Sequence, residues 1–248
     1  MAGPRHVEFF GLPGSGKTTL VEHLARKNGE VYEFRTGYRT AVCNKCFPTG
    51  VSGICQRLPT GVVDMIARFI GLTGETSDAA FLSTARSLVP QYTDLAERQE
   101  TVMGWIRTLF LRHQIARELL PQTATLLCDE GYLMRGNAVF SPANPTTDLN
   151  FDDVDRYLEF APRPDFVVYL DIPLEVSERR IRTRESGPPE SMANQDRKER
   201  RRRLRRMQTY VKHAYETLEG DGVRCFRVEN DDLSLEEAMA EIATKLPL

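Results

Sequence analysis

The 248-residue sequence has no apolar run of the roughly 18 residues that a membrane-spanning helix needs. It has no excess of one charge either, because 33 basic and 35 acidic side chains leave a net charge of −2. This balance argues against nucleic acid or an anionic membrane as the main partner. The first apolar stretch, Val7 to Leu12, is too short for a signal peptide, so we expect a cytoplasmic protein.

Internal repeats and low-complexity linkers are absent from the sequence. Five cysteines without an export signal indicate free thiols in a reducing compartment. Cys43 and Cys46, followed by Cys55, suggest part of a zinc site, but no fourth ligand stands at a suitable spacing. Zinc is therefore the less favoured interpretation. The length is sufficient for a full hydrophobic core, and we expect a single domain over residues 1–248.

What the sequence does contain is an apolar strand that runs into a glycine-rich loop with the spacing Gly-x-x-x-x-Gly-Lys-Thr. The glycines allow consecutive N–H groups to point inward around an anion, and the helix that follows adds its positive end. Lys17 is expected to reach the outer phosphates, and the Thr18 hydroxyl to be a ligand of Mg²⁺. The predicted nucleoside triphosphate site comprises Gly11, Leu12, Pro13, Gly14, Ser15, Gly16, Lys17, Thr18 and Thr19.

Short apolar segments alternate with helical patterns along the chain, which is typical of a parallel sheet covered by helices. Strands are expected at 7–10, 31–34, 124–128, 166–170 and 224–228. Helices are expected at 18–27, 61–72, 78–88, 94–120, 152–160, 174–183, 197–219 and 235–246. The pattern predicts a three-layer α/β fold with a five-stranded parallel sheet. Its ligands should bind beyond the carboxyl ends of the strands.

Residues 38–90 are too numerous for a simple crossover, and they carry several short helical patterns. We interpret them as an inserted helical lobe that shapes an acceptor pocket. The stretch 185–194, which contains Gly-Pro-Pro, is expected to be the most mobile loop.

Two carboxylates, Asp129 and Glu130, follow the third expected strand, at the sheet edge where the glycine loop should lie. A carboxylate at this position can hold the water shell of Mg²⁺. Asp129 continues the strand and is the preferred metal ligand, while Glu130 could orient the metal or the acceptor. The alternative is that Asp129 only caps the turn after the strand.

Four arginines occur within residues 179–184, at the end of an expected helix. Guanidinium groups on a closing loop would neutralise the charge of a transferring phosphoryl group. The alternative is a solvated helix end, where cations favour the helix dipole. Arg180 is a candidate ligand of the nucleotide, and Arg182 and Arg184 are candidate catalytic residues.

Glu33 and Arg35 close the second expected strand at the same sheet edge. Glu33 could accept a proton from a hydroxyl nucleophile, and Arg35 could bind an acceptor anion. Either residue could instead be a solvated strand end. Arg112 lies among apolar neighbours in a long helix, where an arginine usually has an anion partner, and it is a candidate acceptor ligand. His113 beside it is expected on the surface.

The run 197–206 holds eight basic residues and one acidic residue. The apolar stripe that follows indicates an amphipathic helix, so most of these arginines should be solvated and nucleic acid is disfavoured. Arg197, Arg200 and Arg201 could nevertheless reach a phosphate near the expected loop.

The chain resembles the nucleoside and nucleoside monophosphate kinases, thymidylate kinases above all. The resemblance rests on Gly-Leu-Pro-Gly-Ser-Gly-Lys-Thr-Thr at 11–19 and Val-Val-Tyr-Leu-Asp-Ile-Pro-Leu-Glu-Val-Ser-Glu-Arg-Arg at 167–180. It covers residues 1–35 and most of 105–246, with 38–90 unmatched. It implies a P-loop NTPase fold, ATP and Mg²⁺ as cofactors, and an arginine-rich lid at 182–196. It also implies that Asn230 lies in a loop that contacts adenine.

The resemblance further implies that Arg112, Glu33 and Arg35 approach the acceptor. Thymidylate kinases carry Asp-Arg after the third strand and deoxynucleoside kinases carry Glu-Arg-Ser, whereas this chain has Asp129-Glu130-Gly131. A carboxylate in place of a cation that grips phosphate favours a neutral, hydroxyl-bearing acceptor. The expected function is phosphoryl transfer from ATP to a small molecule. A nucleotide hydrolase or switch, a non-catalytic nucleotide-binding regulator, and a homodimeric assembly stay open.

Overall fold

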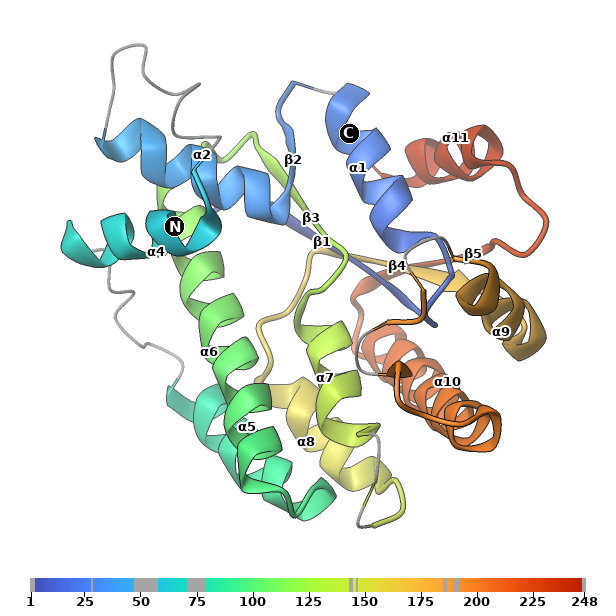
Figure 1. The fold of residues 1–248 in the computed structure, drawn as a ribbon. Coiled ribbons are helices and arrows are strands. Elements are labelled where there is room, and N and C mark those ends of the chain that lie inside the picture. The colour runs from blue at the N-terminus through green and yellow to red at the C-terminus, as the bar shows by residue number, and fades with distance from the viewer. Residues whose placement is uncertain are drawn as a thin grey trace.

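The computed structural model contains a central parallel sheet of five strands with helices on both faces (Figure 1). It describes residues 3–27, 29–46, 58–70, 79–142, 145, 147–184, 187–189 and 192–246. The strands are β1 (Arg5–Gly11), β2 (Val31–Glu33), β3 (Thr125–Cys128), β4 (Phe166–Asp171) and β5 (Arg224–Glu229). Their order in the sheet is β2-β3-β1-β4-β5, and all neighbouring pairs are parallel. The predicted strand pattern is therefore confirmed.

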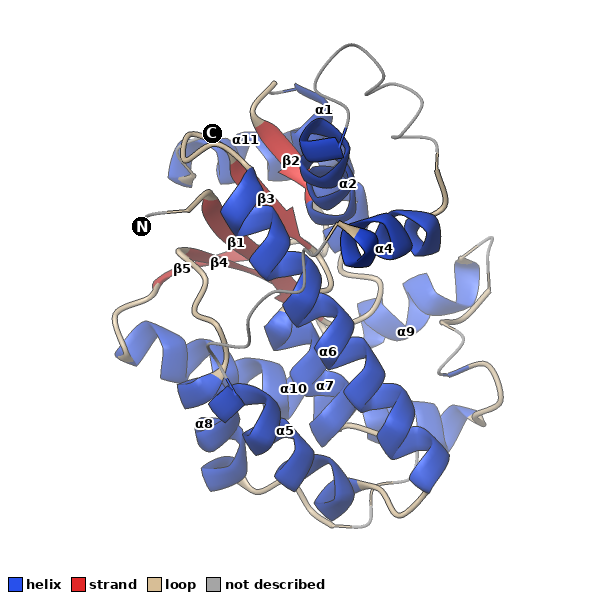
Figure 2. Ribbon diagram, turned by 90° about the vertical axis from the view of Figure 1, so that its left-hand side faces the viewer, coloured by secondary structure: helices blue, strands red, loops and turns tan. Residues whose placement is uncertain are grey.

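The helices fill the two outer layers, as Figure 2 shows. They are α1 (Lys17–Lys27), α2 (Phe34–Cys46), α4 (Thr60–Phe69), α5 (Ala79–Tyr92), α6 (Ala96–Leu119), α7 (Tyr132–Phe140), α8 (Phe151–Phe160), α9 (Leu174–Thr183), α10 (Arg197–Gly220) and α11 (Leu235–Lys245). No helix within these described segments is both long and apolar enough to cross a bilayer.

The central strand β1 separates two hydrophobic clusters, because its side chains alternate between the faces of the sheet. Val7 and Phe9 pack with apolar residues of α1 and α11. Phe10 packs on the other face with α5, α6, α7, α8 and α10. A strand buried on both faces is mostly apolar, which is why the sequence predicts β1.

The sequence patterns do not predict two of the helices. The first is α2, which begins at Phe34, where the sequence favoured the end of a strand. The Glu33 carboxylate accepts hydrogen bonds from the backbone N–H groups of Arg35 and Thr36, at 3.0 and 2.9 Å, and so stabilises the first turn of α2. The expected lobe 38–90 begins within this helix and continues through α4 and α5. Its segments 47–57 and 71–78 lie outside the described residues, and its boundaries stay a prediction.

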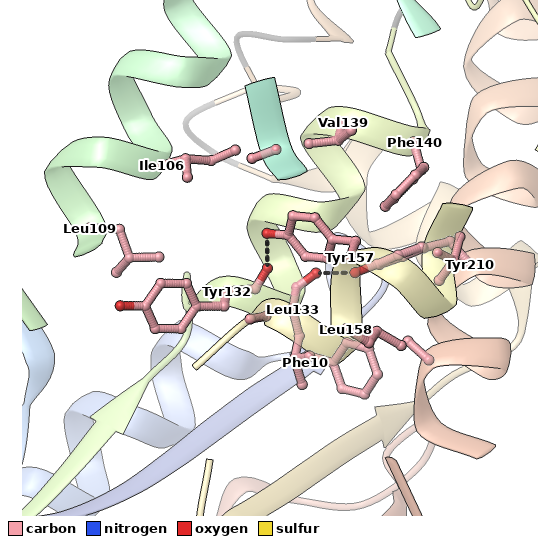
Figure 3. Close-up of a cluster of buried hydrophobic side chains, with 14 of the residues drawn as sticks. Phe10, Ile106, Leu109, Tyr132, Leu133, Val139, Phe140, Tyr157, Leu158 and Tyr210 are labelled. Atoms are coloured by element: carbon pink, nitrogen blue, oxygen red, sulfur yellow. Dashed lines mark hydrogen bonds between the residues drawn. The ribbon is translucent and has the colours of Figure 1, made fainter. Parts of the chain in front are cut away.

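The second is α7, a short helix with glycine and asparagine inside it, which is unfavourable for helix formation in isolation. Tertiary contacts stabilise it. Tyr157 donates a hydrogen bond to the Tyr132 carbonyl at 2.9 Å, and Tyr210 donates one to the Leu133 carbonyl at 2.8 Å (Figure 3). The first turn of α7 is therefore fixed by side chains from α8 and α10.

Gly136 of α7 provides a test of this packing. A Cβ there would lie 1.9 Å from the Tyr210 hydroxyl oxygen, and Tyr210 is fully buried. Gly136→Ala is expected to lower the free energy of unfolding by about 1–3 kcal/mol, measured by urea denaturation. Gly104→Ala on α6 is the matched control, because a Cβ there meets nothing within 4 Å. It should raise stability by up to about 1 kcal/mol. Equal effects at both sites would contradict the packing argument.

Candidate active site

The loop between β1 and α1 turns sharply at the carboxyl end of the sheet. Gly11, Gly14 and Gly16 have φ values of 149°, 81° and 91°, in the region that favours glycine. A Cβ on Gly11 would also lie 2.4 Å from the Leu170 carbonyl oxygen of β4. The backbone at these positions is compatible with glycine and with little else, as the sequence pattern requires.

Side chains from α9 and from the segment after β5 hold the loop in place. Ser177 donates to the Pro13 carbonyl at 2.7 Å, Arg180 to the Gly14 carbonyl at 3.1 Å, and the Asn230 amide to the Ser15 carbonyl at 2.7 Å. Arg180 also donates to the Asp231 carbonyl at 2.9 Å. Arg180 and Asn230 therefore contact the loop itself, and their contact with a nucleotide stays a prediction.

Lys17 lies inside the loop. Its ammonium donates to the carbonyls of Gly11 and Leu12 at 3.0 and 2.9 Å, and to the Ser15 hydroxyl at 3.3 Å. Burial lowers the pKa of Lys17 to about 8, although the carboxylates of Asp129 and Glu130 oppose this shift. A buried lysine among backbone carbonyls is a cation ready to pair with a phosphate.

The structure brings Thr18 and Asp129 together from opposite halves of the chain. The Thr18 hydroxyl, on the first turn of α1, donates to an Asp129 carboxylate oxygen at 2.6 Å. Asp129 follows β3, which lies next to β1 in the sheet, so the two side chains meet at the same edge. A hydroxyl and a carboxylate oxygen are ligands that Mg²⁺ accepts, with water in its remaining positions. The predicted pair fits a magnesium ion.

Zinc receives no support from the described part of the chain. No group of three or more His, Cys, Asp or Glu side chains with metal-site geometry occurs there. Cys55 lies outside the described residues.

Two clefts share the wall formed by Glu33, Arg35, Asp129 and Glu130. The first has a volume of about 690 Å³ and reaches Thr18 and Arg184. The second has a volume of about 320 Å³. Its remaining lining residues are Phe34, Thr60, Trp105, Thr108, Leu109, Arg112, Cys128 and Arg135.

Seven predicted site residues line the two clefts: Thr18, Glu33, Arg35, Arg112, Asp129, Glu130 and Arg184. Arg182 is exposed on α9 and lines neither cleft, whereas Arg184 lines the same cleft as Thr18. Leu12 is buried with Ile172 and Met192, and Thr19 is exposed at the start of α1. The expected lid, 182–196, includes residues 185, 186, 190 and 191, which lie outside the described residues.

The arginines of the second cleft are bonded to carboxylates. Arg112 donates from Nε and from its terminal nitrogen to the two oxygens of Asp64, at 3.1 and 2.7 Å, and Tyr38 donates to the same carboxylate at 2.9 Å. Burial would raise the pKa of Asp64, but the hydrogen bonds and charge of Arg112 lower it overall. Arg35 and Arg135 both donate to Glu130. The expected anion partner of Arg112 is therefore present within the chain.

Sequence reasoning missed Trp105, Arg135 and Asp64. The guanidinium groups of Arg98 and Arg135 lie 5.1 and 5.3 Å from the Trp105 ring centre. A signal for Trp105 does exist in the sequence. Trp105, Thr108, Leu109 and Arg112 follow the i, i+3, i+4, i+7 spacing of one helix face, and all four line the second cleft.

His113 is a correction to the sequence interpretation. It is buried, not on the surface, and its Nδ1 lies 3.0 Å from the Tyr132 hydroxyl oxygen. Burial lowers the pKa of His113, and the charges of His6 and Arg117 lower it further. The residue is part of the core between α6 and α7.

Most arginines in the basic run of α10 are expected to be solvated, but Arg203 is buried. This side chain is 5% exposed and donates to the Ser141 carbonyl at 2.9 Å, while Arg206 donates to the Phe140 carbonyl. Burial lowers the pKa of Arg203 to about 10, and the charge of Arg98 contributes. Both arginines bind the carboxyl end of α7, where cations favour the helix dipole. Arg201 pairs with two glutamates of α9, and its contact with a phosphate stays a prediction.

Beneath the site lies a fully buried carboxylate, Glu8 of β1. It accepts hydrogen bonds from the backbone N–H groups of Tyr132 and Leu133, both at 2.9 Å. It therefore caps α7 and fixes the turn formed by Asp129, Glu130 and Gly131. Sequence reasoning did not single out Glu8, because a glutamate inside a buried strand has no local signature.

Neither a protein-family model nor a curated protein matches the sequence. Solved structures share its fold. Deoxyadenosine kinase from M. mycoides with bound dATP is 15% identical, with 98% of this chain and 100% of that chain covered and a TM-score of 0.51. Thymidylate kinase from Candida albicans is 14% identical, with 98% and 91% covered and a TM-score of 0.51. The chain has the P-loop kinase fold. The predicted fold class, and the resemblance at the level of fold, are confirmed.

Proposed function

We propose that the chain is a small-molecule kinase that transfers the γ-phosphoryl group of ATP to a hydroxyl group of an acceptor. The observation that carries this proposal is that the two clefts share one wall. The Thr18–Asp129 pair, beside the glycine loop and Lys17, lines the first cleft. The second cleft shares the wall of Glu33, Arg35, Asp129 and Glu130 and adds Arg112 and Arg135. A donor site and an acceptor site side by side are what a phosphotransferase needs.

The glycine loop and Lys17 bind the phosphates of the donor. Thr18 and Asp129 would hold Mg²⁺, which when bound supplies positive charge to the donor phosphates. Arg184 neutralises charge on the phosphoryl group. Arg182 does the same when the lid moves it inward. During transfer, a bond forms between the acceptor oxygen and the γ-phosphorus, and the bond to the bridging oxygen of ADP breaks. The hydroxyl proton passes to a carboxylate, for which Glu33 is the candidate.

Glu33 is bonded to the first turn of α2, and its side chain lines both clefts. Its position supports a role near the acceptor, where Arg35 and Arg112 also lie. The balanced net charge supports a small molecule, not nucleic acid or a membrane, as the partner of a cytoplasmic enzyme.

A mass-spectrometric screen tests the function. The protein is incubated with ATP, Mg²⁺ and pools of nucleosides, nucleotides, sugars and amino alcohols, and a mass gain of about 80 Da marks the phosphorylated acceptor. A phosphorylated compound that depends on Lys17 supports the kinase. Free phosphate without an acceptor product supports a hydrolase, and nucleotide binding without turnover supports a regulatory protein.

A further inference from the structure

Glu130 joins two walls of the second cleft. One of its carboxylate oxygens accepts a hydrogen bond from Arg135 of α7 at 2.8 Å and another from Arg35 of α2 at 3.2 Å. The Glu130 side chain is 50% exposed, so it faces the cleft while it makes both pairs. Two guanidinium groups that converge on one oxygen form an anion site, and the chain supplies the anion itself.

The third arginine of the cleft is engaged as well. Arg112 binds Asp64 through two hydrogen bonds, in the bidentate geometry that is strongest for this pair. Within the described part of the chain, each arginine that lines this cleft is therefore bonded to a carboxylate.

The charges of the cleft favour an uncharged ligand. Three arginines and three carboxylates, Glu33, Asp129 and Glu130, line the cleft, and Asp64 adds a fourth carboxylate as the partner of Arg112. A phosphate monoester that enters would have to displace Glu130 from both arginines, or lie beside it and be repelled. A neutral acceptor leaves the ion pairs intact, and its hydroxyl groups can donate to the carboxylates. Phe34, Trp105 and Leu109 provide an apolar wall for the rest of such a molecule.

We propose that Glu130 is a specificity-determining residue, which selects neutral hydroxyl acceptors and excludes acceptors that already carry a phosphate. This proposal rests on the proposed kinase function. Its physical content is that the carboxylate of Glu130 occupies the position that an acceptor phosphate would take between Arg35 and Arg135.

Glu130→Gln tests the proposal, because glutamine keeps the size of the side chain and removes its charge. Wild-type protein should phosphorylate nucleosides or sugars with a kcat/KM at least about tenfold above that for the matching monophosphates. In the variant this ratio should fall at least about tenfold, through a gain on the monophosphates. Glu216→Gln on α10 is the matched control, since Glu216 pairs with Lys212 on the same helix. It should leave the ratio unchanged.

A binding measurement separates this proposal from the kinase function. Trp105 is the single tryptophan of the chain and lines the cleft, so its fluorescence reports occupancy without catalysis. Titration with a nucleoside and with its monophosphate should show the neutral compound bound more tightly by the wild type, and a gain in monophosphate affinity in Glu130→Gln. Equal or tighter binding of monophosphates by the wild type, no gain in the variant, or no binding of any neutral compound overturns the proposal. Preserved neutral binding without any phosphorylated product overturns the kinase function instead.

Discussion

Lys17→Ala is expected to lower the rate of phosphoryl transfer by about a thousandfold or more. The Lys17 ammonium lies inside the glycine loop, where it donates to two backbone carbonyls and the Ser15 hydroxyl. In this water-poor position its charge acts on a bound phosphate with little screening. The rate is measured as kcat from the appearance of the phosphorylated acceptor.

The matched control is Lys27→Ala, at the exposed end of the same helix, which should leave kcat within about twofold of the wild type. The fold should survive in both variants. Lys17→Ala should change the midpoint of thermal unfolding little, because the loss of its three hydrogen bonds offsets the relief of burying a charge. A Lys17→Ala variant that keeps a tenth of the wild-type kcat would contradict the role of this residue.

The pH dependence of nucleotide binding follows from the same burial, which lowers the pKa of Lys17 to about 8. In the free protein the ammonium loses its proton as the pH rises through this value. A bound polyphosphate favours the charged form, so the complex holds more protons than the free protein above pH 8. ATP should therefore bind more weakly as the pH rises above 8, and binding should take up protons. Calorimetric titration in two buffers of different ionisation enthalpy detects the uptake, and Lys17→Ala should abolish it.

The parts of this molecule that the sequence predicts are those with local causes. The sequence predicts the glycine loop because the loop backbone requires glycine at fixed spacing. It predicts β1 because Val7, Phe9 and Phe10 are apolar residues buried on the two faces of the sheet. The meeting of Thr18 and Asp129 also follows, since parallel strands end at one edge of the sheet.

The parts that it does not predict depend on partners far along the chain. α7 has weak intrinsic helix propensity and is held by Tyr157 and Tyr210. The sequence predicts His113 on the surface, on the helix face next to that of Arg112, whereas its environment is set by Tyr132. The resemblance bears on Glu130, which stands where those kinases carry a cation, and it gives no reason for Gly131. The structure gives a physical reason for Gly131.

Gly131→Ala is expected to lower kcat by about a hundredfold, because it displaces the turn that carries Asp129. The φ of Gly131 is −73°, which any residue can adopt, so the constraint is one of space. A Cβ there would lie 2.3 Å from the Glu8 carboxyl carbon and 2.5 Å from both of its oxygens. Glu8 cannot retreat without losing two backbone hydrogen bonds, and it is fully buried. The turn must therefore move instead, and Asp129 moves with it, away from Thr18.

A double-mutant cycle distinguishes this local clash from general destabilisation. Glu8→Ala removes the carboxylate and leaves room for the new methyl group, so Gly131→Ala should cost less free energy of unfolding in that background than in the wild type. A coupling of about 0.5–3 kcal/mol is expected for residues in contact. Gly104→Ala combined with Glu8→Ala is the matched control and should be additive, because a Cβ at Gly104 meets nothing within 4 Å. Additivity in both pairs would show that Glu8 does not constrain Gly131. If Gly131→Ala unfolds more easily but keeps its kcat, then contacts other than Glu8 hold Asp129 beside Thr18.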